Sequence, residues 1–153
     1  KLELAQLIRE LCEISIANDP AWFELSSRAS GGQARSSVGL VHGIAHVLEG
    51  VINESEITYK VRHAQLCAMF IWPVMKLNIS IDKSLDSTFN EYGIDLEKIM
   101  KKTKSLFNEK DFAFILPFLK DNWRNILIDP STRTNCVLVR PNFISYFEQG
   151  NFH

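Results

Sequence analysis

The sequence predicts an all-helical bundle, and three observations support this fold class. In several stretches apolar residues recur at steps of three and four, which is the spacing of one helix face. Residues 64–75 are apolar on every side, as expected of a helix at the centre of a bundle. The sequence has no internal repeat and no alternation of strand and helix patterns. A length of 153 residues suits one domain, so we expect a single helical domain over residues 1–153.

Two helices are expected at the beginning of the chain, over about residues 2–17 and 21–36. Asn18-Asp19-Pro20 separates them, because it combines capping side chains with a proline at the favoured first helical position. The pair Gly31-Gly32 lies among other small residues, which suggests that the second helix packs closely on a neighbour. The first helix is predicted from one apolar face, formed by Leu4, Leu7, Ile8, Leu11, Ile14 and Ile16.

Two further helices are expected in the middle of the chain. One follows Gly39 and ends at about Glu49 or Gly50, and residues 51–59 then form a polar loop. The next begins near Tyr59, and Pro73 is expected to kink or end it. Its apolar run is too short for a membrane span, which needs about 18 to 20 apolar residues.

Two shorter helices are expected after this central pair. The first starts at Asp82 or Ser84 and ends at Gly93, where a left-handed cap belongs. Asp95 caps the second helix, which has a lysine-rich outer side. The inner stripe of that helix consists of Leu96, Ile99, Met100, Thr103, Leu106 and Phe107.

The last third of the chain should hold one or two helices between residues 111 and 129, interrupted at Pro117. Residues 131–135 are expected to be a loop, and residues 137–139 a brief extended segment. A final short helix should begin at Asn142 and end by Gly150.

Composition narrows the function classes. With 17 basic and 18 acidic residues the chain lacks the charge that draws in nucleic acid or an anionic membrane. No signal-peptide pattern is present, and the cysteines (Cys12, Cys67 and Cys136) are odd in number and widely spaced. Such cysteines are typical of reduced core thiols in a cytoplasmic protein. Lys1 stands inside a helical pattern, which is how a piece of a longer protein begins.

Three of the four histidines form the most informative cluster. His42 and His46 are four residues apart, so their imidazoles lie on one helix face, and His63 opens the next apolar helix. Neutral imidazole is a common ligand of iron and zinc. A metallopeptidase is disfavoured because Gly43 stands where its general-base glutamate would be. Glu49 is either a carboxylate ligand on nearly the same face or a solvent-facing residue near the helix end.

Longer motifs surround these histidines. Gly39-x-x-His42-x-x-x-His46 is followed by His63, which opens an apolar helix that ends with Pro73 and Asn78. Near the end of the chain stands Asp129-Pro130-Ser131-Thr132-Arg133-Thr134-Asn135. Together these motifs resemble the signature of the iron-containing (group III) alcohol dehydrogenases. The resemblance implies the C-terminal helical domain of a dehydroquinate synthase-like fold.

The resemblance also implies an activity and its cofactors. In that family an N-terminal α/β domain holds NAD or NADP and would precede Lys1. Fe²⁺ or Zn²⁺ is bound by residues matching His42 and His63, together with an aspartate and a histidine that would also precede Lys1. The residue matching His46 lines the substrate site and can relay the alkoxide proton. This chain alone is therefore expected to bind metal weakly and to be inactive.

The sequence departs from that family around the third histidine. Residues 47–62 form a longer interval than the family has, and the insertion from Gly50 to Lys60 should lie at the mouth of the cleft. Arg62 stands in place of a proline. With Lys60 it either meets an anionic group of the substrate or is a solvated loop charge. Trp72 is either a core residue or close enough to touch the substrate.

Two alternatives to a dehydrogenase of alcohols and aldehydes remain open. A dehydroquinate synthase-like lyase uses similar histidines, and a non-catalytic helical module would keep the histidines but bind a partner. The expected partners are the small alcohol or aldehyde, the N-terminal domain and a second copy of the chain. Apolar surface left where the N-terminal domain docks would allow this homodimer to form.

Overall fold

The computed structural model describes residues 2–14, 20–35, 38–55, 61–104, 107 and 109–150. All regular secondary structure in these ranges is helical, which confirms the predicted all-helical class. In chain order the elements are α1 (Leu2–Glu13), α2 (Ala21–Arg35), α3 (Leu40–Glu54), α4 (His63–Ile81), α5 (Ser84–Glu91), α6 (Leu96–Lys104), α7 (Glu109–Asp121), α8 (Trp123–Ile128), α9 (Pro130–Arg133), the 3-10 turn η1 (Pro141–Phe143) and α10 (Ile144–Glu148).

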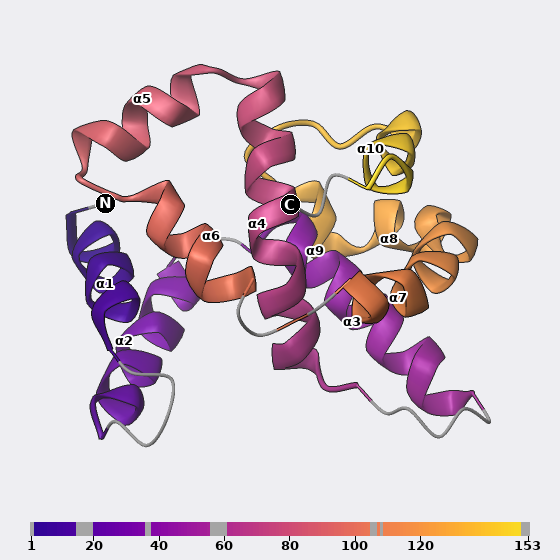
Figure 1. Cartoon of the computed structure of the whole chain (residues 1–153), viewed down its shortest axis with the longest axis horizontal. Coiled ribbons are helices and arrows are strands. Elements are labelled where there is room, and N and C mark those ends of the chain that lie inside the picture. The colour runs from indigo at the N-terminus through magenta and orange to yellow at the C-terminus, as the bar shows by residue number, and fades with distance from the viewer. Residues whose placement is uncertain are drawn as a thin grey trace.

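Helices α3 and α4 form the centre of the molecule. They pack along each other, with α7, α8 and α9 against α3 and α6 against α4 (Figure 1). Residues four apart lie on the same face of a helix, and one such stripe of α3 is completely buried. The stripe consists of Leu40, Ile44, Leu48 and Ile52, and it shares one core with Leu66, Phe70, Val74 and Leu77 of α4.

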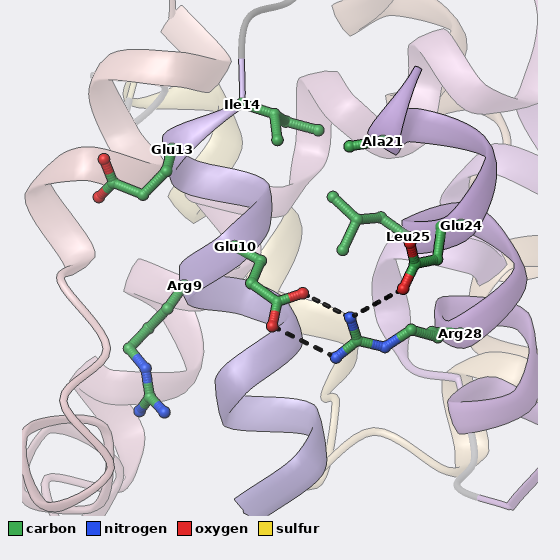
Figure 2. Close-up of a pocket in the computed structure, with 8 residues that line it drawn as sticks. All are labelled: Arg9, Glu10, Glu13, Ile14, Ala21, Glu24, Leu25 and Arg28. Carbon is green, nitrogen blue, oxygen red and sulfur yellow. Dashed lines mark hydrogen bonds and ion pairs between the residues drawn. The ribbon is translucent and has the colours of Figure 1, made fainter. Parts of the chain in front are cut away.

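Helices α1 and α2 form a hairpin at one edge of the molecule, seen in indigo and violet in Figure 1. The hairpin contacts the rest of the protein mainly through α6. Lys102 of α6 donates hydrogen bonds to the carbonyl oxygens of Cys12 and Ile14 at the end of α1. Between α1 and α2 lies a pocket of about 380 Å³, in which Arg28 pairs with Glu10 (Figure 2).

Both prolines that were expected to interrupt helices lie inside them. Helix α4 continues through Pro73 to Ile81, and α7 continues through Pro117. The chain breaks instead at Asn122, between α7 and α8. A proline removes one helical hydrogen bond, but tertiary packing can offset that loss. Pro73 is fully buried inside α4, so the predicted end of the helix there is wrong, whereas the alternative of a kink at Pro73 stays a prediction.

Helix α3 is longer than expected, because residues 51–54 are its last turn rather than a loop. The Asn53 side chain donates to the carbonyl oxygen of Val61 and accepts from its N–H, which joins the end of α3 to the approach to α4. Helix α4 begins at His63. The predicted start near Tyr59 and the loop charge Lys60 lie outside the described residues, as does the junction at Asn18 and Asp19.

The C-terminal predictions are partly met. Gly93 has the expected left-handed backbone (φ 64°), and Asp95 caps α6 by accepting the N–H of Lys98. Residues 130–133 are helical rather than loop, because Asp129 caps this turn and Pro130 suits its first position. Residues 137–139 form no strand.

Helix α4 has the length and apolar composition of a membrane-crossing helix, and it is longer than the apolar run that the sequence suggested. The central helix of a water-soluble protein meets the same criterion. Since Leu66, Phe70 and Val74 of α4 lie in the shared core, the criterion is weak evidence for a membrane span.

Candidate metal centre

The structure brings His42, His46 and His63 together from two neighbouring helices. His42 and His46 stand on the first two turns of α3, and His63 is the first residue of α4. The ring centroids are 5.3 Å apart for His42 and His63 and 5.1 Å apart for His46 and His63. The centroids of His42 and His46 are 6.0 Å apart. Residues that are distant in the sequence therefore form one cluster.

Asn135 fixes the beginning of the helix that carries two of these histidines. Its Oδ1 accepts the N–H of Leu40 at 3.1 Å, which satisfies a donor at the start of α3. Its Nδ2 donates to Oδ1 of Asn78 in α4 at 2.9 Å. A Cβ on Gly39 would lie 2.6 Å from the Asn135 Oδ1, so this hydrogen bond requires a glycine there. Asn135 thus joins α3, α4 and the segment after α9.

Gly43 allows α9 to pack directly on the histidine helix. A Cβ at this position would lie 1.9 Å from Oγ1 of Thr132, which is closer than any real contact. Thr132 is buried, and nearby Thr134 donates a hydrogen bond to the carbonyl oxygen of Val38. The segment 129–135 is therefore held against the start of α3 by close packing and side-chain hydrogen bonds.

His46 faces this same segment. Its Nδ1 lies 3.4 Å from Oδ2 of Asp129 and 3.5 Å from Oγ of Ser131. The Asp129 side chain is only 15% exposed, whereas that of His46 is 46% exposed. A carboxylate beside Nδ1 favours the tautomer with the proton on that nitrogen. The other ring nitrogen is then free to accept a proton.

His63 is oriented by a carboxylate from α3. Glu49 Oε1 accepts the backbone N–H of His63 at 3.0 Å, and Oε2 lies 3.6 Å from His63 Nδ1. A carboxylate is favourable at this position because it satisfies an unpaired donor at the positive end of α4. Neither sequence interpretation of Glu49 describes this arrangement, since it contacts His63 rather than facing solvent alone or joining His42 and His46.

Cys67 completes a group that the sequence analysis missed. One ligand atom each from His42, His63 and Cys67 lies within 4.8 Å of the other two, and all three residues are half-buried. Cys67 lies one helical turn after His63, and this four-residue spacing was available in the sequence. It was interpreted as core packing because the residue stands in an apolar run.

Burial determines the protonation states in this group. The pKa of His42 is lowered below its usual value, mainly by desolvation and to a smaller extent by the neighbouring His63 and His46. Its ring is therefore neutral at pH 7. The pKa of Cys67 is raised to about 11, mainly by desolvation and to a smaller extent by the negative charge of Glu49. Its sulfur therefore carries a proton at pH 7. His42 therefore offers a neutral nitrogen ligand, and Cys67 offers a thiol that can lose its proton when a cation binds.

The two predicted substrate residues lie on the same helix or next to it. Arg62 is exposed immediately before α4, and its backbone N–H donates to Oε1 of Gln65. Trp72 is half-buried and stands nine residues after His63, about 13 Å along the helix axis. Lys76 lies over its ring at 6.0 Å. Substrate binding by Arg62 and Trp72 stays a prediction.

The other two cysteines are not on the histidine helices, and they differ from each other in burial. Cys12 is half-buried in α1, whereas Cys136 is exposed after α9, so the expectation of a core thiol is wrong for Cys136.

Comparison of the chain with family models, with curated proteins and with solved structures gives no match. The motif residues and their geometry are therefore the features of this chain that point to a function.

Proposed function

We propose that this chain is the metal- and substrate-binding helical domain of an NAD(P)-dependent alcohol dehydrogenase that contains iron or zinc. The observation that supports this most is the cluster of His42, His46 and His63, whose ring centroids lie 5.1 to 6.0 Å apart. These are the histidines of the motif that resembles the iron-containing alcohol dehydrogenases. The second motif segment, 129–135, packs on the same helix turn.

The side chains present fit a divalent metal ion. His42 and His63 would hold it, since imidazole nitrogens are ligands that zinc and divalent iron accept. A bound ion would supply Lewis-acid chemistry at an alcohol or carbonyl oxygen. The described residues contain no βαβ unit of the kind that binds NAD(P), so the proposal requires a separate domain for the nicotinamide.

His46 is the residue that would move a proton. The Asp129 carboxylate beside Nδ1 orients the ring, and the exposed side of the ring allows exchange with solvent. Imidazole accepts and releases protons near neutral pH, as a relay for the hydroxyl proton of an alcohol requires. Asp129 is a positioning residue in this arrangement, because it acts through His46.

The metal-binding half of the proposal is tested by calorimetry. Zn²⁺ and Fe²⁺, the latter without oxygen, are titrated into the chain and into His42→Ala, with Lys101→Ala as a surface control. We expect one ion per chain, with binding lost in His42→Ala and retained in Lys101→Ala. The absence of binding by the longest protein that the coding sequence specifies would overturn the proposal.

The dehydrogenase half needs the nicotinamide domain. The longest protein that the coding sequence specifies is expressed and assayed for reduction of NAD⁺ and NADP⁺ with a panel of primary alcohols and diols. We expect turnover that falls about 100-fold or more in His46→Ala, as general acid–base groups contribute about that much. A metal-loaded protein that oxidises no alcohol and reduces no aldehyde would contradict this half alone.

A further inference from the structure

We propose that Cys67 is a metal ligand, so that His42, His63 and Cys67 form a three-ligand site selective for zinc. The inference rests on the proposed function in one respect, because it concerns the same metal centre. It adds a ligand that the resemblance does not supply, and it makes the site independent of residues outside the described chain. The fourth position of the metal then stays open for an oxygen of the substrate, as in catalytic zinc sites.

The geometry of the three side chains supports the ligand set. The ligand atoms lie within 4.8 Å of one another. An ion at the centre of such a triangle lies at most about 2.8 Å from each atom, compared with roughly 2.0–2.3 Å for zinc bonds to nitrogen and sulfur. Side-chain rotations that move each ligand atom by under about 1 Å therefore bring all three within bonding distance of the ion, and α3 and α4 need not move.

The backbone of the site is fixed before any metal binds. His63 and Cys67 stand one turn apart on α4, and His42 reaches them from α3, which packs along α4. Both helices contribute to the same buried core. Ligands on packed helices lose little freedom on binding, which favours affinity.

Neighbouring groups divide the histidines into two roles. Glu49 lies beside Nδ1 of His63, which leaves the other nitrogen of His63 for the metal. Nδ1 of His46 faces Asp129 and Ser131 instead, and His46 is absent from the group whose ligand atoms converge. His46 therefore remains available to a substrate while the other two histidines bind.

The thiol also determines the choice of metal. Binding breaks the S–H bond, the proton passes to the solvent, and the thiolate donates an electron pair to the ion. Thiolate with imidazole is a ligand set that suits zinc, whereas non-haem iron sites typically combine histidines with a carboxylate. The nearby carboxylate, Glu49, accepts the backbone N–H of His63 and lies beside its Nδ1, and it is absent from the group whose ligand atoms converge. We therefore expect Zn²⁺ to bind more tightly than Fe²⁺.

Cobalt spectroscopy tests the ligand directly. Co²⁺ replaces zinc in such sites, and a thiolate bound to it gives a charge-transfer band in the near ultraviolet. The chain is compared with Cys67→Ser, and Cys12→Ser and Cys136→Ser serve as matched controls because their cysteines are also free. We expect the band in the unmodified chain and in both controls, and its loss in Cys67→Ser. Zinc affinity should fall by about 100-fold in Cys67→Ser, because the loss of a residue that only supports a metal ligand already costs about 10- to 100-fold.

A second measurement requires no variant and covers the case in which Cys67→Ser fails to fold. The rate of alkylation of each cysteine is measured by mass spectrometry with and without Zn²⁺. Zinc should protect Cys67 and leave Cys136 unchanged. Equal alkylation of Cys67 in both conditions, with zinc shown to be bound, would overturn the inference.

The outcomes separate this inference from the proposed function. Cobalt that binds, is lost in His42→Ala and gives no charge-transfer band would overturn the role of Cys67 and leave the histidine metal centre standing. A chain that binds no cobalt or zinc would overturn the role of Cys67, because this inference makes the site complete within the chain. The histidine metal centre would be overturned as well only if the longest protein that the coding sequence specifies also bound no metal. Tighter binding of Fe²⁺ than of Zn²⁺ would contradict the selectivity.

Discussion

The α3–α4 pair and the α1–α2 hairpin are both pairs of consecutive helices, but they are held in different ways. The central pair buries continuous apolar stripes, and α9 packs so closely that Gly43 has no room for a side chain. The hairpin contributes few buried apolar residues, namely Ala5, Leu7 and Leu25. Ion pairs and side-chain hydrogen bonds join it to its surroundings, for example between Lys98 and Glu13.

This difference explains which part of the molecule can hold the side chains of a metal site in fixed positions. Ligands must be held within a fraction of an ångström, and close-packed helices do this better than elements joined by exposed polar contacts. The histidines and Cys67 stand on the central pair, whereas the pocket in Figure 2 is lined by α1, α2 and the residues next to them. We therefore expect metal binding to depend strongly on the centre and weakly on the hairpin.

The largest expected effect comes from truncating a central aromatic residue. Phe70 is fully buried, and its ring contacts those of Phe112 and Phe147, so Phe70→Ala should lower the free energy of unfolding by about 3 to 5 kcal/mol. Leu7→Ala in the hairpin should cost about 2 kcal/mol at most, at the low end for buried leucines. Urea denaturation measures both.

Zinc affinity, measured in the same two variants, also distinguishes the centre from the hairpin. Phe70→Ala should weaken zinc binding, because it loosens the packing under α4, and Leu7→Ala should leave zinc binding unchanged. Equal effects of the two substitutions on affinity would contradict the separation of the centre from the hairpin.

The next effect concerns the contact between α3 and α9. Gly43→Ala places a methyl group on Thr132 Oγ1, so α9 must move, at an expected cost of about 1 to 3 kcal/mol. Gly50→Ala is the matched control, because it lies on the same helix with nothing within 4 Å. That substitution should stabilise the protein by about 0.5 to 1 kcal/mol through helix propensity.

Thermal unfolding of the two glycine variants gives the comparison directly. In Gly43→Ala the displacement of α9 should also separate Asp129 from His46, which a change in the NMR chemical shifts of the His46 ring would detect. If Gly43→Ala proved as stable as Gly50→Ala, the close approach of α9 would be refuted.

The third effect is the pH dependence of zinc binding. Only deprotonated ligands bind, and the pKa of Cys67 is raised to about 11, so affinity should rise about tenfold per pH unit between pH 7 and 9. In Cys67→Ser this rise should vanish. The lowered pKa of His42 means that proton competition at this ring begins only below the usual range of histidine. Calorimetry across this pH range, corrected for the buffer, measures the slope.

The presence of the helices was predictable because amphipathic spacing is a local property. The capping role of Asp95 and the left-handed Gly93 were confirmed for the same reason. The helix end at Pro73 and the interruption at Pro117 were wrong, since propensity alone cannot weigh a lost hydrogen bond against burial that depends on other helices.

The site was predictable to the extent that its residues follow a motif. The spacing of His42 and His46 indicated one face, but the approach of His63 depends on how two helices pack. Glu49 and Cys67 belong to no motif, and their proximity to His63 follows from the register of α3 against α4. The four-residue step from His63 to Cys67 was visible in the sequence, yet thiols in apolar helices are usually packing residues.

The smallest expected effect lies in the hairpin pocket. Glu10 and Arg28 are paired there and both side chains are partly exposed, so Arg28→Ala should change thermal stability near pH 7 by little. The hydrogen bond from Arg28 is the main cause that lowers the pKa of Glu10. Because the pKa of Glu10 is lower in the folded state, the pair stabilises the protein at pH values above the usual pKa of glutamate. That stabilisation is lost as the pH falls through the lowered value.

An NMR titration of the Glu10 carboxyl should show this pKa returning to the ordinary range in Arg28→Ala. Zinc affinity should stay unchanged in that variant, because the pocket shares no residue with the metal centre. A loss of zinc binding in Arg28→Ala comparable to that in Phe70→Ala would show that the hairpin and the centre are coupled. The contrast between a close-packed centre and a peripheral hairpin would then have to be abandoned, since contacts through α6 would be transmitting the change to the metal ligands.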